Sequence, residues 1–276
     1  MTIINSFSEF EKQTAKEFLE KGYTVQPCEN IEGLKQFRKK IAEWFCEKTS
    51  LPPPQKSENK WFDKIHQQVT TDQINEPRMH CYSELNKEAW ARPTYYSLAR
   101  KTLTDVVGNE LVMQNRININ IMMPGDSGSN IPLHIDAHSG ESPFQCVLWV
   151  PLTDAHGSKG IFLLPPNANQ NALKNFKDWM QRGGRGKVME EIQEDLVWPE
   201  VPFGSFLLFS PTLLHGSLVN ETNETRWSWN TRFKSLFSPY GSQEKGLGSF
   251  YLPILTSPAT HFGLQYSPPE GLKLHE

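Results

Sequence analysis

The sequence predicts a mainly β fold with helices on its N-terminal flank. Three observations support this class. Apolar residues in the first hundred positions follow a helical spacing, the spacing changes to a period of two from about residue 111, and residues 204–216 form an apolar run that glycines bound. A chain of 276 residues can hold one large β domain or two small ones. We expect a single domain, with a helical flank over 1–109, a β core over 110–240 and a C-terminal extension over 241–276.

Three helices are expected in the N-terminal flank. The first begins at a capping box of Ser6 and Glu9 and ends at Gly22. The second covers residues 30–48 and stops at a run of prolines, and the third covers residues 93–108. Their expected core residues are Phe7, Phe10, Thr14 and Phe18, then Leu34, Phe37, Ile41, Trp44 and Phe45, then Tyr95, Leu98, Ala99, Leu103 and Val106.

A strand is predicted over residues 115–121, where polar and apolar residues alternate strictly. The usual orientation would put the isoleucines inside. A barrel around a polar ligand can instead turn its asparagines inward and cover the isoleucines with helices. We favour the second orientation for Asn118 and Asn120, and a turn over 124–128 then leads to the next strand.

The composition excludes several classes of partner and location. Lys and Arg number 28 against 31 Asp and Glu, so neither nucleic acid nor an anionic membrane is expected as the main partner. The N-terminal residues lack a secretory pattern and no apolar run is long enough to span a membrane, which predicts a cytoplasmic protein. Cys28, Cys46, Cys81 and Cys146 are far apart and are expected to be free thiols.

Two histidines and one aspartate form a candidate metal site. His134 and Asp136 are two positions apart, so on an extended strand both side chains would project from one face. His215 closes the apolar run of residues 204–216, which is typical of a buried strand with an imidazole at its end. Two imidazoles and one carboxylate are the ligand set of a non-haem Fe(II) facial triad, which indicates oxygen chemistry.

Arg226, eleven positions after His215, is a candidate for binding a carboxylate. It shares one strand face with Ser228, Asn230 and Arg232. A guanidinium matches a carboxylate with two parallel hydrogen bonds and stays charged when it is desolvated, so Arg226 and Ser228 together would form a carboxylate socket. Arg232 is the alternative, and Arg116 is the third choice.

These motifs resemble the Fe(II)/2-oxoglutarate dioxygenase superfamily, and within it the phytanoyl-CoA-hydroxylase-like branch. The matching segments are His134-x-Asp136, residues 147–155, residues 160–165, Gly204-Ser205, His215-Gly216-Ser217 and Arg226. The resemblance implies a double-stranded β-helix, which is a cupin-like jelly roll, with Fe(II) on His134, Asp136 and His215 as the catalytic centre. It also implies that 2-oxoglutarate chelates iron and meets Arg226, assisted by Ser228, with Asn118 and Arg232 as further cofactor contacts. Succinate and CO2 would be released.

Residues 230–240 also resemble the streptomycin-biosynthesis-type oxygenases of sporadic carbohydrate gene clusters. This narrower resemblance implies a sugar or a nucleotide-sugar as the substrate. Asp136 favours hydroxylation, because related halogenases lack this carboxylate and leave room for chloride. His138 is expected to hydrogen-bond near the metal rather than to bind it.

The stretch over residues 166–198 admits two interpretations. It is long, rich in asparagine and charge, and interrupts the strand pattern, so it is predicted to be a lid with Phe176 and Trp179 as substrate contacts. The alternative is a solvated helical excursion.

Two other functions stay open on the sequence. A jelly roll can be a non-catalytic carbohydrate-binding protein, for which Trp149, Trp198, Trp227 and Trp229 would be stacking surfaces. A cupin-like metalloenzyme that does not use 2-oxoglutarate is the second alternative. The expected partners are a small-molecule substrate and O2, and a homo-oligomer is left open.

Overall fold

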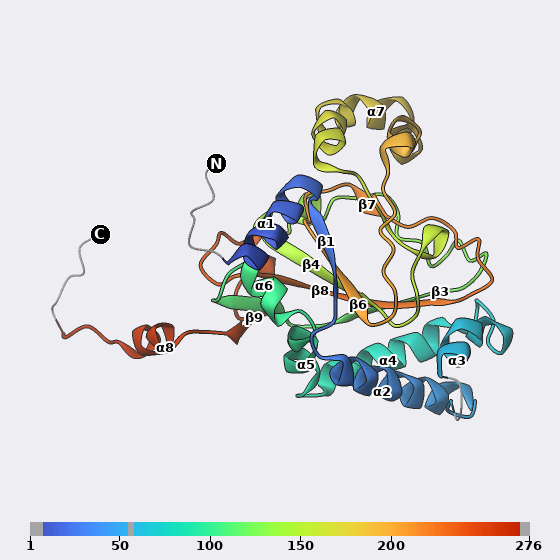
Figure 1. The fold of residues 1–276 in the computed structure, drawn as a ribbon, viewed down its shortest axis with the longest axis horizontal. Coiled ribbons are helices and arrows are strands. Elements are labelled where there is room, and N and C mark those ends of the chain that lie inside the picture. The colour runs from blue at the N-terminus through green and yellow to red at the C-terminus, as the bar shows by residue number, and fades with distance from the viewer. Residues whose placement is uncertain (1–7, 55–57, 271–276) are drawn as a thin grey trace.

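An antiparallel β structure with helices along one side forms the body of the protein, as the computed structural model in Figure 1 shows. The structure describes residues 8–54 and 58–270. The larger sheet has the strand order β1 (Tyr23–Pro27), β6 (Ser205–Phe209), β4 (Gln145–Pro151), β8 (Arg226–Ser235), β2 (Leu111–Gln114) and β9 (Tyr251–Leu255). A further strand, β3 (Asn118–Met122), pairs with the other part of the long strand β8. The smaller sheet consists of β5 (Phe162–Leu163) and β7 (His215–Gly216).

This arrangement confirms the predicted class, a mainly β fold of the cupin-like jelly-roll type with flanking helices, although the sheet is not closed into a barrel. Two of its strands, β1 and β9, come from outside residues 110–240, where the sequence placed the β core. Both form the edges of the larger sheet, because each has only one neighbour in it.

A layer of helices covers one face of the larger sheet. It contains α2 (Ile31–Thr49), α3 (Glu58–Lys64), α4 (Asn75–Lys87) and α5 (Ala91–Ser97), which lie below β3 and β8 in Figure 1. The main hydrophobic core lies between this layer and the sheet, and in it Phe37 of α2 packs edge-on against Trp229 of β8. Ile117, Ile119 and Ile121 belong to the same core, which confirms that the isoleucines lie under helices.

The N-terminal helices differ from the prediction at three places. Helix α1 (Glu9–Lys21) is capped by Ser8, and its capping box pairs Ser8 with Glu11 rather than Ser6 with Glu9. Ser6 lies outside the described residues, and the true pair has the same three-residue spacing. Helices α3 and α4 were not predicted at all.

The helix predicted over residues 93–108 is in fact two helices, α5 and α6 (Arg100–Val106). Ala99 leaves the helical conformation with φ of −142°, and the carbonyl of Leu98 accepts a hydrogen bond from Glu29. The backbone thus bonds to the segment between β1 and α2 instead of continuing the helix.

The strands around the candidate metal ligands also differ from the prediction. His134 takes part only in an isolated bridge with His215, and Asp136 begins a short 3-10 helix, so the predicted strand through both residues was wrong. The apolar run also breaks, since β6 ends at Phe209, before Ser210 and Pro211. Proline cannot donate to a strand ladder, and His215 therefore belongs to a new strand, β7.

Residues 166–198 are largely helical. Helix α7 (Pro166–Ile192) is kinked at Gly183 and Gly184, and Gly184 has a positive φ of 62° that favours glycine. Trp179 is buried in the cluster that joins α7 to the body, so it is not exposed for substrate contact as predicted. Phe176 is partly buried against the same cluster, and its ring lies 5.7 Å from that of His138.

Two predictions from composition can be compared with the structure. All four cysteines are free, as expected. Within residues 8–54 and 58–270, no helix combines the length and the apolar character needed to cross a bilayer. Helix α8 (Pro258–Gln265) lies near the C-terminus, away from the sheets (Figure 1).

Candidate metal centre and adjoining pocket

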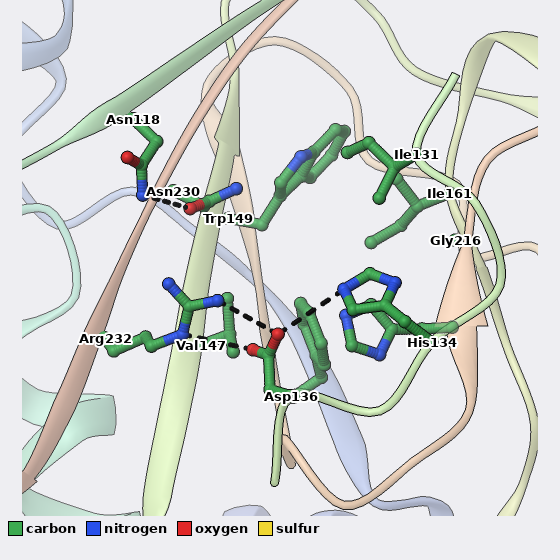
Figure 2. Close-up of a pocket in the computed structure, with 12 residues that line it drawn as sticks. Asn118, Ile131, His134, Asp136, Val147, Trp149, Ile161, Gly216, Asn230 and Arg232 are labelled. Carbon is green, nitrogen blue, oxygen red and sulfur yellow. Dashed lines mark hydrogen bonds and ion pairs between the residues drawn. The ribbon is translucent and has the colours of Figure 1, made fainter. Parts of the chain in front are cut away.

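His134, Asp136 and His215 come together at one point between the two sheets. One ligand atom from each residue lies within 4.8 Å of the others, which is a spacing that one metal ion can bridge. The backbones of the two histidines exchange hydrogen bonds of 3.0 Å in both directions, and their rings are 4.1 Å apart. The 3-10 turn at Asp136 then directs its carboxylate back to His134, with 3.4 Å between Oδ1 and Nε2 (Figure 2).

Both imidazoles are oriented by backbone carbonyls. Nδ1 of His134 lies 2.8 Å from the carbonyl of Pro132, and Nδ1 of His215 lies 2.9 Å from the carbonyl of Leu213. When Nδ1 carries the proton and donates it to these carbonyls, Nε2 keeps a free lone pair. Burial, together with the neighbouring His134, lowers the pKa of His215 to about 4, so this ring is neutral and able to bind a metal at pH 7.

Arg232 of β8 holds the third candidate ligand. Its guanidinium contacts both oxygens of Asp136, with distances of 2.9 Å to Oδ1 and 3.1 Å to Oδ2. Burial alone would raise the pKa of Asp136, but the neighbouring His134 and the charge of Arg232 outweigh it and hold this pKa far below its usual value. The carboxylate is therefore ionised, as a metal ligand must be.

A cavity of about 220 Å³ opens beside these three side chains. Both sheets contribute to its wall, β4, β6 and β8 from the larger one and β7 from the smaller one. Figure 2 shows Asn118 and Asn230 on one side of it, where the amide of Asn118 donates to Asn230 over 3.1 Å. The full lining is Asn118, Ile131, His134, Asp136, Val147, Trp149, Ile161, Phe209, His215, Gly216, Asn230 and Arg232.

Arg226 lies behind this wall. Its guanidinium is completely buried, 5.8 Å from the ring centroid of Trp149. It donates to the carbonyl of Gly160 over 2.6 Å and to the side-chain oxygen of Asn120 over 2.7 Å, while its Nε has no partner. Within the described part of the chain no carboxylate forms an ion pair with it, and burial lowers its pKa to about 9.

The hydroxyl of Ser228 is the nearest polar group along the same strand face. It is also buried and has no hydrogen-bond partner. Because buried polar groups are nearly always satisfied, the free Nε of Arg226 and the free hydroxyl of Ser228 leave two hydrogen-bonding positions for a ligand or an ordered water.

The predicted site residues therefore fall into two groups. His134, Asp136, Asn118 and Arg232 line the cavity together with His215, whereas Arg226 and Ser228 are buried and are not among the lining residues. Arg116 is not among the lining residues and is exposed, and His138 is exposed and outside the ligand group.

Several residues shape the site in ways that their sequence positions did not reveal. Asn120 points inward as predicted but holds Arg226, and Trp149 lines the cavity. Glu141 is a buried second carboxylate 3.8 Å from Arg232. For Asn120 the strict alternation of its strand was the available signal, whereas no local pattern marks Glu141.

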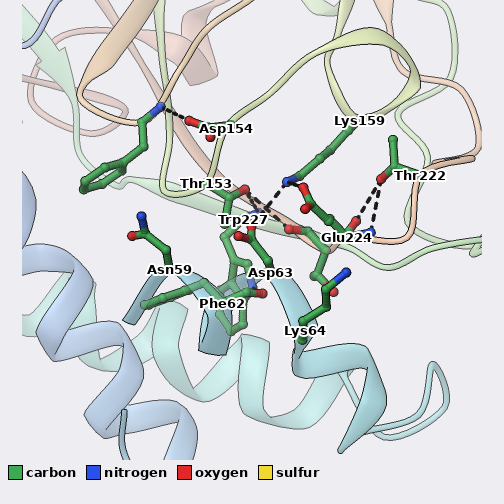
Figure 3. A network of polar contacts seen from close by, with 12 residues as sticks. Asn59, Phe62, Asp63, Lys64, Thr153, Asp154, Lys159, Thr222, Glu224 and Trp227 are labelled. Atoms are coloured by element: carbon green, nitrogen blue, oxygen red, sulfur yellow. Dashed lines mark hydrogen bonds and ion pairs between the residues drawn. The ribbon is translucent and has the colours of Figure 1, made fainter. Parts of the chain in front are cut away.

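Lys159 is the least expected of these residues. Its side chain is completely buried and forms ion pairs of 2.8 Å with Glu224 and 3.3 Å with Asp63 of α3 (Figure 3). The carbonyls of Lys159 and Gly160 are the ones that accept hydrogen bonds from Arg226. The network thus connects the helical layer to the loop that orients Arg226.

Several solved structures share this fold. "ThoJ apo", a non-heme monooxygenase, has a TM-score of 0.55 at 16% identity over 88% of this chain and 84% of its own. EctD from S. alaskensis with bound Fe has a TM-score of 0.54 at 16% identity, over 87% and 81% of the two chains. HygX from Streptomyces hygroscopicus, with nickel and 2-oxoglutarate bound, has a TM-score of 0.54 at 13% identity, over 85% and 90%.

The sequence also matches the profile of a protein family. No curated protein matches the chain. The profile of the family described as "Phytanoyl-CoA dioxygenase (PhyH)" matches residues 18–228, a segment that contains His134, Asp136, His215, Arg226 and Ser228. The chain therefore belongs to the phytanoyl-CoA dioxygenase family of Fe(II)- and 2-oxoglutarate-dependent non-haem oxygenases.

Proposed function

We propose that this protein binds Fe(II) through His134, Asp136 and His215 and 2-oxoglutarate through Arg226, and that it hydroxylates or otherwise oxidises a small molecule. The bound iron, 2-oxoglutarate and O2 supply the oxidation, and 2-oxoglutarate leaves as succinate and CO2. The side chains of this protein bind and orient these groups and exclude water from them.

The observation that carries the proposal is the buried, unpaired guanidinium of Arg226 beside the candidate metal site. A buried charge is stable only when it is paired and hydrogen-bonded, and here the protein supplies neutral partners alone. A dicarboxylate could bind the metal with one carboxylate and pair with Arg226 through the other. This favours a 2-oxoglutarate enzyme over a cupin-like metalloenzyme that lacks this co-substrate.

Three features fit the triad to Fe(II). The backbone carbonyls leave Nε2 of both histidines free, His215 is neutral, and Asp136 is ionised. Imidazole and carboxylate donors without thiolates suit Fe(II), although other divalent metals can occupy such a site after purification. Because Asp136 fills the carboxylate position, we infer hydroxylation rather than halogenation.

The lining of the cavity supports a polar substrate. Asn118 and Asn230 present amide groups to it, and Trp149 adds an aromatic face. We propose a sugar or a nucleotide-sugar as the substrate, in a cytoplasmic enzyme. The alternative of a non-catalytic carbohydrate-binding protein loses two of its expected stacking surfaces, since Trp227 and Trp229 are buried in the main core.

The decisive experiment measures co-substrate binding and turnover without a known substrate. Protein reconstituted anaerobically with Fe(II) is expected to show a visible charge-transfer absorption when 2-oxoglutarate is added. In air it should then form succinate slowly. A protein that keeps Fe(II) but shows neither the absorption nor succinate would contradict the proposal.

The Lys159 network should matter for 2-oxoglutarate more than for the metal. Lys159→Met removes the ion pairs with Asp63 and Glu224. The loop whose carbonyls at positions 159 and 160 accept hydrogen bonds from Arg226 is then held less firmly. We expect the KM for 2-oxoglutarate to rise about tenfold, because this is the scale of losing one hydrogen bond to a charged group. The affinity for Fe(II) should stay unchanged.

Lys64→Met is the matched control for this variant. Lys64 lies on α3 next to Asp63, and its amine donates to Asn223 rather than to Asp63 or Glu224. If Lys159→Met lowered thermal stability without any change in the KM for 2-oxoglutarate, the network would support the fold alone.

Helix α7 remains our candidate for a lid that orders over the substrate. Water must be excluded during the oxidation. The ring of Phe176 on α7 already contacts that of His138, which lies in the same 3-10 turn as Asp136. Amide hydrogen exchange over residues 166–198 should slow when substrate and 2-oxoglutarate are both present. Exchange that is slow in the free protein and unchanged by ligands would make α7 a rigid support.

A further inference from the structure

A second depression adjoins the catalytic cavity at Asn118. It has a volume of about 330 Å³ and lies between helix α4 and strand β3. Its lining is Arg78, Met79 and Tyr82 from α4, with Arg116, Asn118 and Ile119 from the β3 side. Asn118 lines both spaces, so the two are neighbours at this residue.

The depression contains two guanidinium groups without acidic partners. Arg78 donates to the carbonyl of Ile119 over 3.2 Å and to Asn75 over 2.6 Å, and Arg116 donates to the hydroxyl of Tyr82 over 3.3 Å and to Asn115 over 3.3 Å. All of these acceptors are neutral. Neither arginine forms an ion pair with any residue of the described chain, and each retains N–H donors beyond these bonds.

The two arginines differ in this respect from most lysines of α1 and α2. Surface lysines on α1 and α2 pair with glutamates three or four positions away, such as Lys12 with Glu9 and Lys35 with Glu32. Arg78 and Arg116 instead line the same depression. A hydrogen bond from Arg78 to the carbonyl of Ile119 and one from Arg116 to the hydroxyl of Tyr82 restrain the orientation of the two guanidinium groups. Arginine in such a restrained pair matches the oxygens of a phosphate or a carboxylate.

We propose that Arg78 and Arg116 bind an anionic phosphoryl group of the substrate while its neutral part reaches past Asn118 to the metal. This inference rests on the proposed function, because the depression is a substrate subsite only if the adjoining cavity is catalytic. The substrate class that follows is a phosphorylated small molecule such as a sugar phosphate or a nucleoside diphosphate sugar. The cavity and the depression together are of the size of small-molecule sites, roughly 300–1,000 Å³.

The first test uses inorganic pyrophosphate as the probe and calorimetry as the measurement, on the full chain without added iron or 2-oxoglutarate. Wild-type protein should bind pyrophosphate, and the Arg78→Gln/Arg116→Gln variant should bind it at least tenfold more weakly. The control Lys60→Gln/Arg100→Gln removes the same charge from exposed positions elsewhere and should change the affinity less than twofold. Equal weakening in both variants, or no binding to the wild type at millimolar pyrophosphate, would overturn the proposal.

Arg116→Gln alone is the control in case the double variant fails to fold. Arg116 is exposed, so its replacement should leave the melting temperature unchanged and still weaken pyrophosphate binding severalfold. Unchanged binding in this variant would remove Arg116 from the subsite. Pyrophosphate binding requires neither Fe(II) nor 2-oxoglutarate, so failure here is distinct from failure of the oxygenase proposal, which the charge-transfer absorption and succinate report.

The second test compares matched substrates in the iron-loaded enzyme. Sugar phosphates and nucleoside diphosphate sugars should stimulate 2-oxoglutarate consumption more than the parent sugars do. The Arg78→Gln/Arg116→Gln variant should raise the KM for the stimulating compound at least tenfold, whereas the Lys60→Gln/Arg100→Gln control should change this KM less than twofold. Stimulation by a neutral sugar with the same KM in both proteins would contradict a phosphoryl subsite.

Discussion

His134→Ala is expected to abolish Fe(II) retention and reduce succinate formation to background. The variant removes one of two imidazole ligands from the candidate triad and leaves Asp136 and His215. Loss of groups that only support metal ligands costs about 10- to 100-fold in metal affinity, so loss of a ligand should cost at least ~100-fold. Fe(II) affinity by competition with a chelator and succinate by chromatography are the two measurements.

The fold should tolerate this change. The side chain of His134 is 30% exposed, whereas that of Asp136 is 5% exposed and paired with Arg232, so His134 is the safer position to alter. His261→Ala is the control, because His261 is an exposed imidazole on α8. If His134→Ala bound Fe(II) as the wild type does, the metal site would have to be placed elsewhere.

Arg226→Lys is expected to weaken 2-oxoglutarate binding by roughly 1.5 to 3 kcal/mol, which is the scale of hydrogen bonds to charged groups. The substitution keeps the positive charge but loses the planar pair of donors. Titration of the Fe(II) protein with 2-oxoglutarate, followed by the charge-transfer absorption, measures the change. Fe(II) affinity should stay the same, since Arg226 contacts none of the three candidate ligands.

Two further variants separate the roles of the neighbouring residues. Ser228→Ala removes only the unpartnered hydroxyl and should weaken 2-oxoglutarate binding by a smaller factor. Arg232→Lys disturbs the residue that contacts both oxygens of Asp136, so it should weaken Fe(II) binding first. If Arg232→Lys instead lost 2-oxoglutarate affinity while Arg226→Lys kept it, Arg232 would be the carboxylate partner.

Local patterns were sufficient to predict the parts of this protein that depend on neighbouring residues. The alternation over residues 115–121 predicted a strand and its orientation, with isoleucines under the helices and asparagines facing the site, although the observed strand covers Asn118–Met122. The second helix was predicted within one residue of its observed ends, because Asn30 caps it and prolines follow it. These features depend on periodicity and capping, which the sequence displays directly.

The spacing of His134, Asp136 and His215 identified the candidate metal residues, but for a partly wrong structural reason. They converge without the predicted strand, through a bridge between the two histidines and a 3-10 turn at Asp136. That turn and the start of β7 after Pro211 depend on how the two sheets meet. Short apolar runs do not reveal where a strand ends when tertiary contacts decide it.

The sequence by itself therefore determined the mainly β class, and it identified the candidate metal ligands and the strand face that carries Arg226 and Ser228. Only the tertiary structure decided which arginine is unpaired. It gives Arg232 the carboxylate of Asp136 and leaves Arg226 buried among neutral acceptors, with Lys159, Asp63 and Glu224 supporting the loop beside it. Lys159 and Glu224 are 65 positions apart, and charges so distant in sequence meet only when the chain has folded.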